Sequence, residues 1–260
     1  MEDKKIGRRS FLKTAAISTA TIGVVKSSMA KSGIADTLVQ QPAGSTTMPF
    51  RELGATGENI PILHLGTAQR MDSVYDKVMH LCFKEGVTYF DTALSYGWGS
   101  SHKAIANFIG QIGDRKQLWI TSKSHSGSPK GIVADIDQCL EQLETDYLDL
   151  YLMHQVNNTR MLAKEYLKAG DQLRKSGKIR FFGFSCHGGN VAEIMNTAAK
   201  VGGIDAILFR YNFQRYGDRE LNLAIDACHK AGIGLLAMKT MGGVPRDLEK
   251  VVEFRSQDFT

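Results

Sequence analysis

The stretch 147–153 reads YLDLYLM, an apolar run interrupted by a single charge. Consecutive side chains of a strand point to opposite faces, so this run predicts a strand buried on both sides. Apolar residues recur at helical spacing before it, over 130–144, and after it, over 160–176. A buried strand between two amphipathic helices is the repeating unit of a parallel α/β sheet.

The same unit recurs in both directions along the chain. The predicted strands are 62–67, 87–91, 117–122, 147–153, 179–184, 204–209 and 232–238. The predicted helices are 72–85, 101–110, 130–144, 160–176, 190–201 and 218–231. No G-x-G-x-x-G follows the first strand, and Gly97-Trp98-Gly99 follows the second strand and lacks the third glycine. The alternation therefore predicts an α/β fold of the (β/α)8 TIM-barrel type rather than a dinucleotide-binding open sheet.

Both ends of the predicted barrel depart from simple repetition. Turn residues between apolar flanks at 51–60 predict a hairpin that covers the bottom of the barrel. After the seventh strand, only one further helix, at 246–255, fits the remaining residues. The barrel domain, 49–260, is therefore expected to stop after strand seven with exposed strand edges. Either the sequence is a piece of a longer chain, which we favour, or a partner covers the gap.

Composition is that of a globular protein with one large core. The chain has 260 residues, of which 43% are hydrophobic, and a net charge of +5. Six of its 32 basic residues but only two of its 27 acidic residues lie within the first thirty positions, so a basic face for nucleic acid is not indicated. The four cysteines are widely separated, which argues against a zinc or other metal site and indicates buried free thiols.

The first thirty residues have the pattern of an export signal. The basic segment GRRSFLK at 7–13 is followed by a mildly apolar stretch at 14–25. The residues SMA at 28–30 then form the small-x-small pattern of a signal-peptide cleavage site. This order predicts a bacterial twin-arginine signal, an interaction with the twin-arginine export machinery and a periplasmic or exported location. The apolar stretch is too short for a stable membrane span, and 31–48 has the composition of a linker. The alternative is an amphipathic helix with a chance arginine pair.

Polar side chains gather at the predicted carboxyl ends of three consecutive strands. Asp91 ends the second strand and Tyr96 lies in the loop after it, Lys123 follows the third strand, and His154 follows the fourth. Taken singly, they have structural explanations: a helix cap, a rim residue, a solvated lysine and a core histidine. Active sites of such barrels lie at this face, so the coincidence favours a catalytic set.

Reduction of a carbonyl needs such a set. Hydride adds to the carbonyl carbon, and a proton donor must protonate the carbonyl oxygen as negative charge develops on it. The unperturbed pKa of a tyrosine is about 10, and a neighbouring lysine ammonium favours its phenolate. In this interpretation Asp91 holds Lys123 charged beside Tyr96, and His154 orients the carbonyl.

Three segments resemble the aldo-keto reductases: FDTALSYG at 90–97, LDLYLMH at 148–154 and GKIRFFGFS at 177–185. The resemblance runs from about 50 to 243. It implies an oxidoreductase that reduces an aldehyde or ketone, with Tyr96 as general acid, tuned by Lys123 and Asp91, and His154 orienting a small-molecule carbonyl substrate. It also implies NADP(H), with NAD(H) possible, bound over the barrel mouth.

The resemblance also implies cofactor contacts. Ser185 would hydrogen-bond the nicotinamide carboxamide, while Gly66 and Thr67 would approach the cofactor. The sequence departs from the family at three places: Cys186, followed by His187, replaces an asparagine, Leu208 replaces a glutamine, and the segment 237–243 has no aromatic residue where the family often has one. The predicted cofactor-binding residues are Gly66, Thr67, Ser185, Cys186, Met238 and Lys239. Met238 would cover the ring and Lys239 would meet a phosphate; core filling and a solvated lysine are the plain alternatives.

Two other functions remain open at this point. The first is an exported cofactor-binding or regulatory barrel with little turnover, because free NADPH is not expected outside the cytoplasm. The second is redox chemistry fed by an exported partner. Specificity in this fold depends on the loops, so the substrate does not follow from the sequence.

Overall fold

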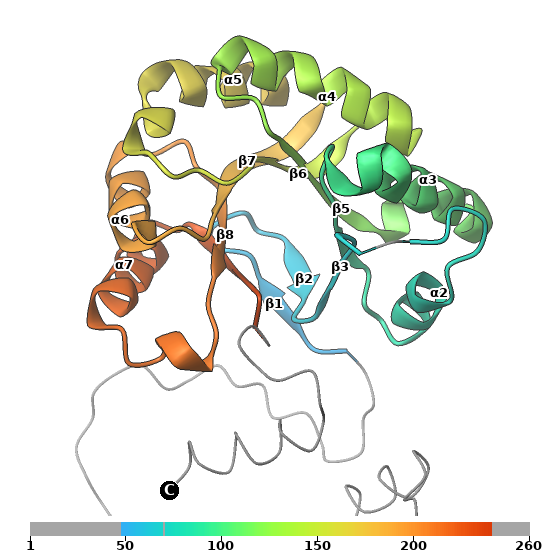
Figure 1. Cartoon of the computed structure of the whole chain (residues 1–260), viewed down its shortest axis with the longest axis horizontal. Helices are drawn as coiled ribbons and strands as arrows, with labels where there is room; N and C mark the ends of the chain where they lie inside the picture. The colour runs from blue at the N-terminus through green and yellow to red at the C-terminus, as the bar shows by residue number, and fades with distance from the viewer. Residues whose placement is uncertain (1–47, 70, 241–260) are drawn as a thin grey trace, which may run out of the picture. The chain divides into compact units, whose positions relative to one another are not determined.

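The computed structural model describes residues 48–69 and 71–240. The expected signal at 1–30, nearly all of the expected linker and the expected helix at 246–255 lie outside these residues. The helix and strand bounds below therefore concern the barrel domain, and its parts are shown in Figure 1.

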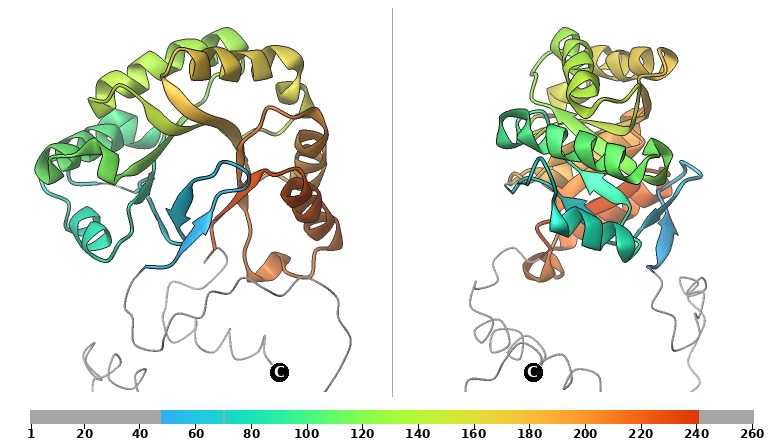
Figure 2. Two further views of the ribbon diagram at one scale, coloured as in Figure 1. Left: turned by 180° about the vertical axis from the view of Figure 1, so that it is seen from behind. Right: turned by 90° about the vertical axis from the view of Figure 1, so that its right-hand side faces the viewer.

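The centre of the structure is a seven-stranded parallel sheet in which each strand pairs with the next one along the chain. The strands are β3 (His64–Gly66), β4 (Tyr89–Asp91), β5 (Trp119–Ser124), β6 (Leu148–Met153), β7 (Ile179–Cys186), β8 (Ala206–Arg210) and β9 (Gly234–Met238). The sheet curls strongly, as in a barrel (Figures 1 and 2). Within the described part of the chain, β3 and β9 each pair on one side only. The predicted fold is confirmed: a TIM-type barrel represented by seven strands.

The α-helices of the described residues cover the convex face of the sheet (Figure 2). They are α2 (Lys77–Lys84), α3 (Ser100–Ile112), α4 (Pro129–Leu143), α5 (Lys164–Lys175), α6 (Val191–Val201) and α7 (Arg219–Lys230). Four 3-10 turns lie in the described connections between strands and helices: η1 (Tyr96–Gly99), η2 (Arg115–Gln117), η3 (Thr159–Leu162) and η4 (Phe213–Arg215). The helix expected at 72–85 begins only at Lys77, because the Asp76 carboxylate caps it by accepting the Val78 and Met79 amide protons.

The sheet separates two apolar layers. An outer layer packs the helices against one face of the strands, with Phe90, Phe182 and Phe184 fully buried in it. A smaller inner layer fills the concave face, and it consists of Leu53, Ile60, Tyr89, Trp119, Leu150, Leu152, Ala206, Leu208 and Leu236. Burial on both faces is the reason that the strands read as continuous apolar runs.

A hairpin closes the inner layer from below. Strands β1 (Phe50–Glu52) and β2 (Asn59–Pro61) pair antiparallel, as predicted for 51–60. Leu53, at its turn, is buried in the inner layer. Gly54 (φ +55°) approaches the start of β9 so closely that a Cβ would lie 2.3 Å from the Gly234 nitrogen. The strand ends at the opposite edge are thereby left open for a site.

The four cysteines are free thiols; Cys139, Cys186 and Cys228 are buried, as predicted, whereas Cys82 is half-buried. None of the helices in the described ranges is long and apolar enough to cross a membrane. The described residues also hold no cluster of three or more acidic, histidine or cysteine side chains suited to a metal ion.

Candidate active site

A cavity of about 330 Å³ lies at the carboxyl ends of the strands. Its walls come from the loops and strand ends between β3 and β9, and they are formed by Ala68, Asp91, Tyr96, Lys123, His154, Gln155, Ser185, His187, Leu208, Met238 and Lys239. All four residues predicted to be catalytic are among them. Three consecutive strands bring them together because parallel strands end at the same edge.

Asp91 and Lys123 form a buried ion pair on neighbouring strands. The Lys123 Nζ lies 2.7 Å from Asp91 Oδ1, and it donates hydrogen bonds to Asp91 Oδ2 (2.8 Å) and to the Thr92 carbonyl (2.6 Å). The lysine is 1% exposed. Burial raises the pKa of Asp91 above its usual value, and the Lys123 charge opposes this shift. The carboxylate thus fixes the ammonium group beside the cavity, with almost no exposed surface.

Tyr96 begins the turn η1, directly above that ion pair. The Lys123 Nζ lies 4.9 Å from the centroid of the tyrosine ring, a cation–π distance. Gly97, Trp98 and Gly99 all have positive φ values, of 56°, 57° and 88°, so the turn depends on the two glycines. The left-handed turn directs the chain from Tyr96 into α3.

His154 faces Tyr96 from the end of β6. Their ring centroids are 5.8 Å apart in an edge-on arrangement. The His154 amide donates to the Ser124 carbonyl (2.8 Å), which fixes the backbone. Burial, together with the neighbouring Lys123, His125 and His187, lowers the pKa of His154 to about 3. The ring is therefore neutral near pH 7, with one nitrogen able to donate a hydrogen bond.

Three of the six residues predicted to bind cofactor line the same cavity: Ser185, Met238 and Lys239. The Ser185 hydroxyl oxygen accepts a 3.0 Å bond from the Gln155 amide, so its own hydrogen remains to be donated. Met238 ends β9 and is half-buried, while Lys239 is exposed at the rim. A hydroxyl donor, a soft apolar surface and a cation therefore share one side of the mouth.

Cys186, Gly66 and Thr67 do not line the cavity. Cys186 is fully buried in the outer layer, where burial raises the pKa of its thiol to about 12. Successive strand residues alternate between faces, so Cys186 points away from the mouth that Ser185 faces. The Thr67 hydroxyl donates to the Asp91 carbonyl (3.0 Å), which gives it a role in holding strand ends together. Gly66 ends β3 beside Asp91.

Ala68, Gln155 and His187 line the cavity but were not among the predicted site residues. Each lies one to two residues beyond the end of a strand, in a loop with no periodic pattern. Burial lowers the pKa of His187, with the charges of Lys239 and Arg210 acting in the same direction. The sequence signal that could have found them is their position in βα loops, which form the top of such barrels.

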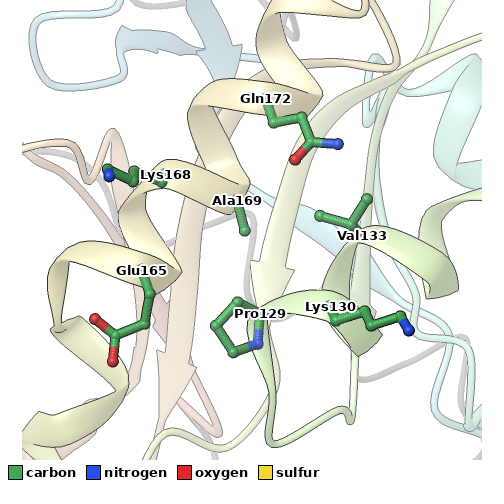
Figure 3. Close-up of a pocket in the computed structure, with 7 residues that line it drawn as sticks. All are labelled: Pro129, Lys130, Val133, Glu165, Lys168, Ala169 and Gln172. Atoms are coloured by element: carbon green, nitrogen blue, oxygen red, sulfur yellow. The ribbon is translucent and has the colours of Figure 1, made fainter.

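A second hollow lies on the outer surface between α4 and α5 (Figure 3). Pro129, Val133 and Ala169 give it an apolar floor. The ends of Lys130, Lys168 and Glu165 point away from one another, so they form no converging set of ligands (Figure 3). This hollow between α4 and α5 therefore offers no candidate catalytic site.

Comparison with known proteins agrees with this geometry. The model of the Aldo/keto reductase family matches residues 63–250. An aldo-keto reductase of Gibberella moniliformis is 29% identical over 210 residues, which cover 75% of this chain and 62% of that protein. The aldo-keto reductase yakc of Schizosaccharomyces pombe, named with NADP(+), is 24% identical over 213 residues, or 76% and 60% of the two chains. This chain thus spans about three fifths of the length of these curated relatives.

A solved structure shows the same fold. The holo form of an aldo-keto reductase from Bacillus halodurans superposes with a TM-score of 0.64 at 21% identity, covering 73% of this chain and 65% of that chain. The cavity described above therefore lies at the mouth of a barrel of known architecture.

Proposed function

We propose that this chain, which belongs to the aldo/keto reductase family, reduces an aldehyde or ketone by hydride transfer from NADP(H), with Tyr96 as the proton donor. The observation that carries the proposal is the convergence of Asp91, Tyr96, Lys123 and His154 on one cavity. A neutral imidazole, a phenol and a buried lysine–carboxylate pair are the groups that carbonyl reduction needs.

The residues divide the reaction between them. The His154 ring donates a hydrogen bond to the carbonyl oxygen and orients it toward the Tyr96 hydroxyl. When bound, the nicotinamide supplies a hydride to the carbonyl carbon, and the C=O π electrons move to oxygen. Tyr96 gives its proton to that oxygen and becomes a phenolate. The Lys123 charge, 4.9 Å from the ring centroid, stabilises the phenolate, and Asp91 keeps the lysine charged.

The cofactor side of the proposal rests on Ser185, Met238 and Lys239. The Ser185 hydroxyl has a hydrogen to donate to a carboxamide, and Met238 offers an apolar surface to a ring. No described carboxylate forms an ion pair with Lys239, which suits a phosphate partner. The NADP(+) in the name of one relative also supports NADP(H), and NAD(H) is the second choice.

We also propose that the protein is exported by the bacterial twin-arginine machinery. The support is the sequence GRRSFLK at 7–13 followed by SMA at 28–30. Because that route carries folded proteins, the barrel would receive its cofactor before export. Replacing Arg8 and Arg9 by lysine should leave the protein in the cytoplasmic fraction of its bacterial host. Equal periplasmic amounts of both forms would refute this proposal.

The first test is cofactor binding by the chain from Lys31 onward, in the longest natural form available. Titration with NADPH and NADH, followed by fluorescence, should show saturable binding of at least one of them. Tyr96→Phe should retain binding and lose about 10²- to 10⁴-fold in turnover of aldehydes, because only the transferable proton is removed. A folded protein that binds neither nucleotide would overturn the proposal.

The second candidate is a cofactor-binding or regulatory barrel with little turnover. Leu208 favours it, because this apolar side chain lines the cavity where the family resemblance implies an amide. Single-turnover and multiple-turnover rates separate the two functions. A cofactor that is oxidised once and then retained favours the regulatory barrel, whereas rapid exchange favours the reductase.

A further inference from the structure

His102 is a fully buried histidine behind the proposed active site. It lies in the first turn of α3, with no exposed surface. Its Nδ1 lies 2.8 Å from Gln142 Oε1 on α4, and its Nε2 lies 2.9 Å from Ser122 Oγ on β5. Both ring nitrogens are thus engaged with different elements of the barrel.

These partners determine the proton arrangement on the ring. An amide oxygen only accepts, so Nδ1 carries the hydrogen and Nε2 accepts from the Ser122 hydroxyl. Burial lowers the pKa of His102 to about 4, which keeps this neutral form near pH 7. We call Gln142, His102 and Ser122 the histidine bridge. In the neutral form both ring nitrogens of His102 have a partner.

One end of the bridge touches the strand that carries the lysine. Ser122 directly precedes Lys123 on β5. Because side chains alternate, Ser122 faces the helices while Lys123 faces the mouth. The hydrogen bond between Ser122 and His102 therefore fixes how far β5 lies from α3 at the position next to Lys123.

The other end supports the turn that carries the tyrosine. Gly99 ends the turn η1, which begins at Tyr96. A Cβ at Gly99 would lie 3.0 Å from Gln142 Oε1 and 3.1 Å from Nε2, so the amide packs directly against the turn. The amide that His102 holds in place is thus the surface on which the turn rests.

We propose that His102 is a positioning residue, which through the histidine bridge sets the distance between the Lys123 ammonium and the Tyr96 ring. This inference rests on the proposed function for its kinetic consequence, but its geometric part stands apart from turnover. The Lys123 charge acts on Tyr96 over 4.9 Å, and catalytic geometry is sensitive to shifts of about 1 Å. The histidine bridge joins β5, which carries Lys123, to the turn η1, which carries Tyr96. The separation of these two elements sets the distance between the Lys123 ammonium and the Tyr96 ring.

The decisive variant is His102→Leu, tested in the full chain. It keeps a buried side chain of similar size and removes both hydrogen bonds. The turnover number should fall by about 10- to 100-fold, while the KM values for cofactor and carbonyl change less than about twofold. His102→Gln should recover most of the turnover, because its amide oxygen can take the place of Nε2 and accept from Ser122.

A spectroscopic signal reports the geometry without turnover. The Tyr96 ring resonances, in protein carrying ring-¹³C tyrosine, are identified by their loss in Tyr96→Phe. They should shift in His102→Leu and return toward their wild-type position in His102→Gln. The matched control is His64→Leu, which removes another imidazole, half-buried and stacked on Tyr89 at the opposite end of the strands. The control should leave the Tyr96 resonances unchanged.

The outcomes separate the two proposals. If the His102→Leu protein loses stability but keeps the wild-type Tyr96 resonances, then His102 contributes only to packing, and the inference is overturned. A wild-type protein without carbonyl turnover would refute the proposed function, while the resonances would still decide whether the histidine bridge positions Tyr96.

Discussion

The two ends of the barrel each hold an ion-paired aspartate, and the two aspartates differ in their partners. At the bottom, the Asp149 side chain is 4% exposed and receives bonds from Arg115 (2.8 Å), Arg180 (2.9 Å) and the Ile120 amide (2.8 Å). At the mouth, Asp91 binds Lys123 alone among the described side chains. The bottom site is saturated with hydrogen bonds, whereas the mouth is not.

Unsatisfied groups gather at the mouth. His154 Nδ1 is buried without a hydrogen-bond partner in the described part of the chain. Burial raises the pKa of Asp91 and lowers that of His154. A buried polar group left without a partner costs free energy, so such groups are retained where function uses them. The difference between the two ends indicates that the bottom network stabilises the fold, whereas polar groups at the mouth retain hydrogen-bonding capacity for a ligand.

Lys123→Met should have the largest effect of all and should act on both activity and stability. Turnover should fall by about 10²- to 10⁴-fold, because the phenolate of Tyr96 loses its cation. Removing one partner of a buried pair also destabilises the fold by about 3–5 kcal/mol, since Asp91 keeps an uncompensated charge. Steady-state kinetics and urea unfolding measure the two effects. Lys103→Met, at an exposed position, is the control and should change neither turnover nor stability. Full turnover in Lys123→Met would mean that the ion pair at the mouth, like the network at the bottom, serves stability alone.

Asp149→Asn should damage stability alone. The neutral amide cannot serve two guanidinium groups and the Ile120 amide at once, so the free energy of unfolding should fall by about 2–4 kcal/mol. Turnover per folded molecule should stay within about twofold of the wild type. Asp171→Asn, at a half-exposed i,i+3 pair with Arg174, is the matched control. A loss of turnover as large as that of Lys123→Met would show that the bottom network also serves catalysis.

Acidification should weaken the fold through histidines at both ends. Burial lowers the pKa of His64, at the bottom, to about 4, and that of His154, at the mouth, to about 3. Unfolded histidines take up protons below about pH 6.5, whereas these half-buried rings stay neutral down to their lowered pKa values, so the free energy of unfolding falls from about pH 6.5 toward 4.

Urea unfolding at pH 7 and pH 5 measures this difference. His64→Phe, which keeps a ring beside Tyr89, should lose less stability between the two pH values than the wild type. Equal losses would mean that His64 is not buried in its neutral form.

Glu58→Gln should have the smallest effect. Glu58 extends the bottom network from the hairpin to Arg180, but the two side chains are 34% and 38% exposed. Partly exposed ion pairs contribute about 0–1 kcal/mol and are screened by salt. The change in unfolding free energy should therefore stay below about 1 kcal/mol and shrink further at high salt. A larger loss would show that the hairpin depends on this pair rather than on Leu53 and Ile60.

The sequence by itself determined the architecture and predicted the polar residues that gather at the mouth of the barrel. The (β/α) alternation is visible because strands buried on both faces must be apolar throughout, and helices on one face must show a period near 3.6 residues. Asp91, Lys123 and His154 were found because parallel strands end at one edge. Ser185, Met238 and Lys239 followed from the family resemblance, and all of these residues line the cavity.

The tertiary structure alone decided which neighbours share the cavity and which support it from behind. Alternation along β7 sends Cys186 into the outer layer, and the Thr67 hydroxyl is used by the Asp91 carbonyl. Gln155 and His187 lie in loops, whose paths depend on packing rather than on a repeat. His102 meets Ser122 across 20 positions and Gln142 across 40. Contacts between elements so far apart in sequence depend on how the helices pack on the sheet, which no local pattern of residues specifies.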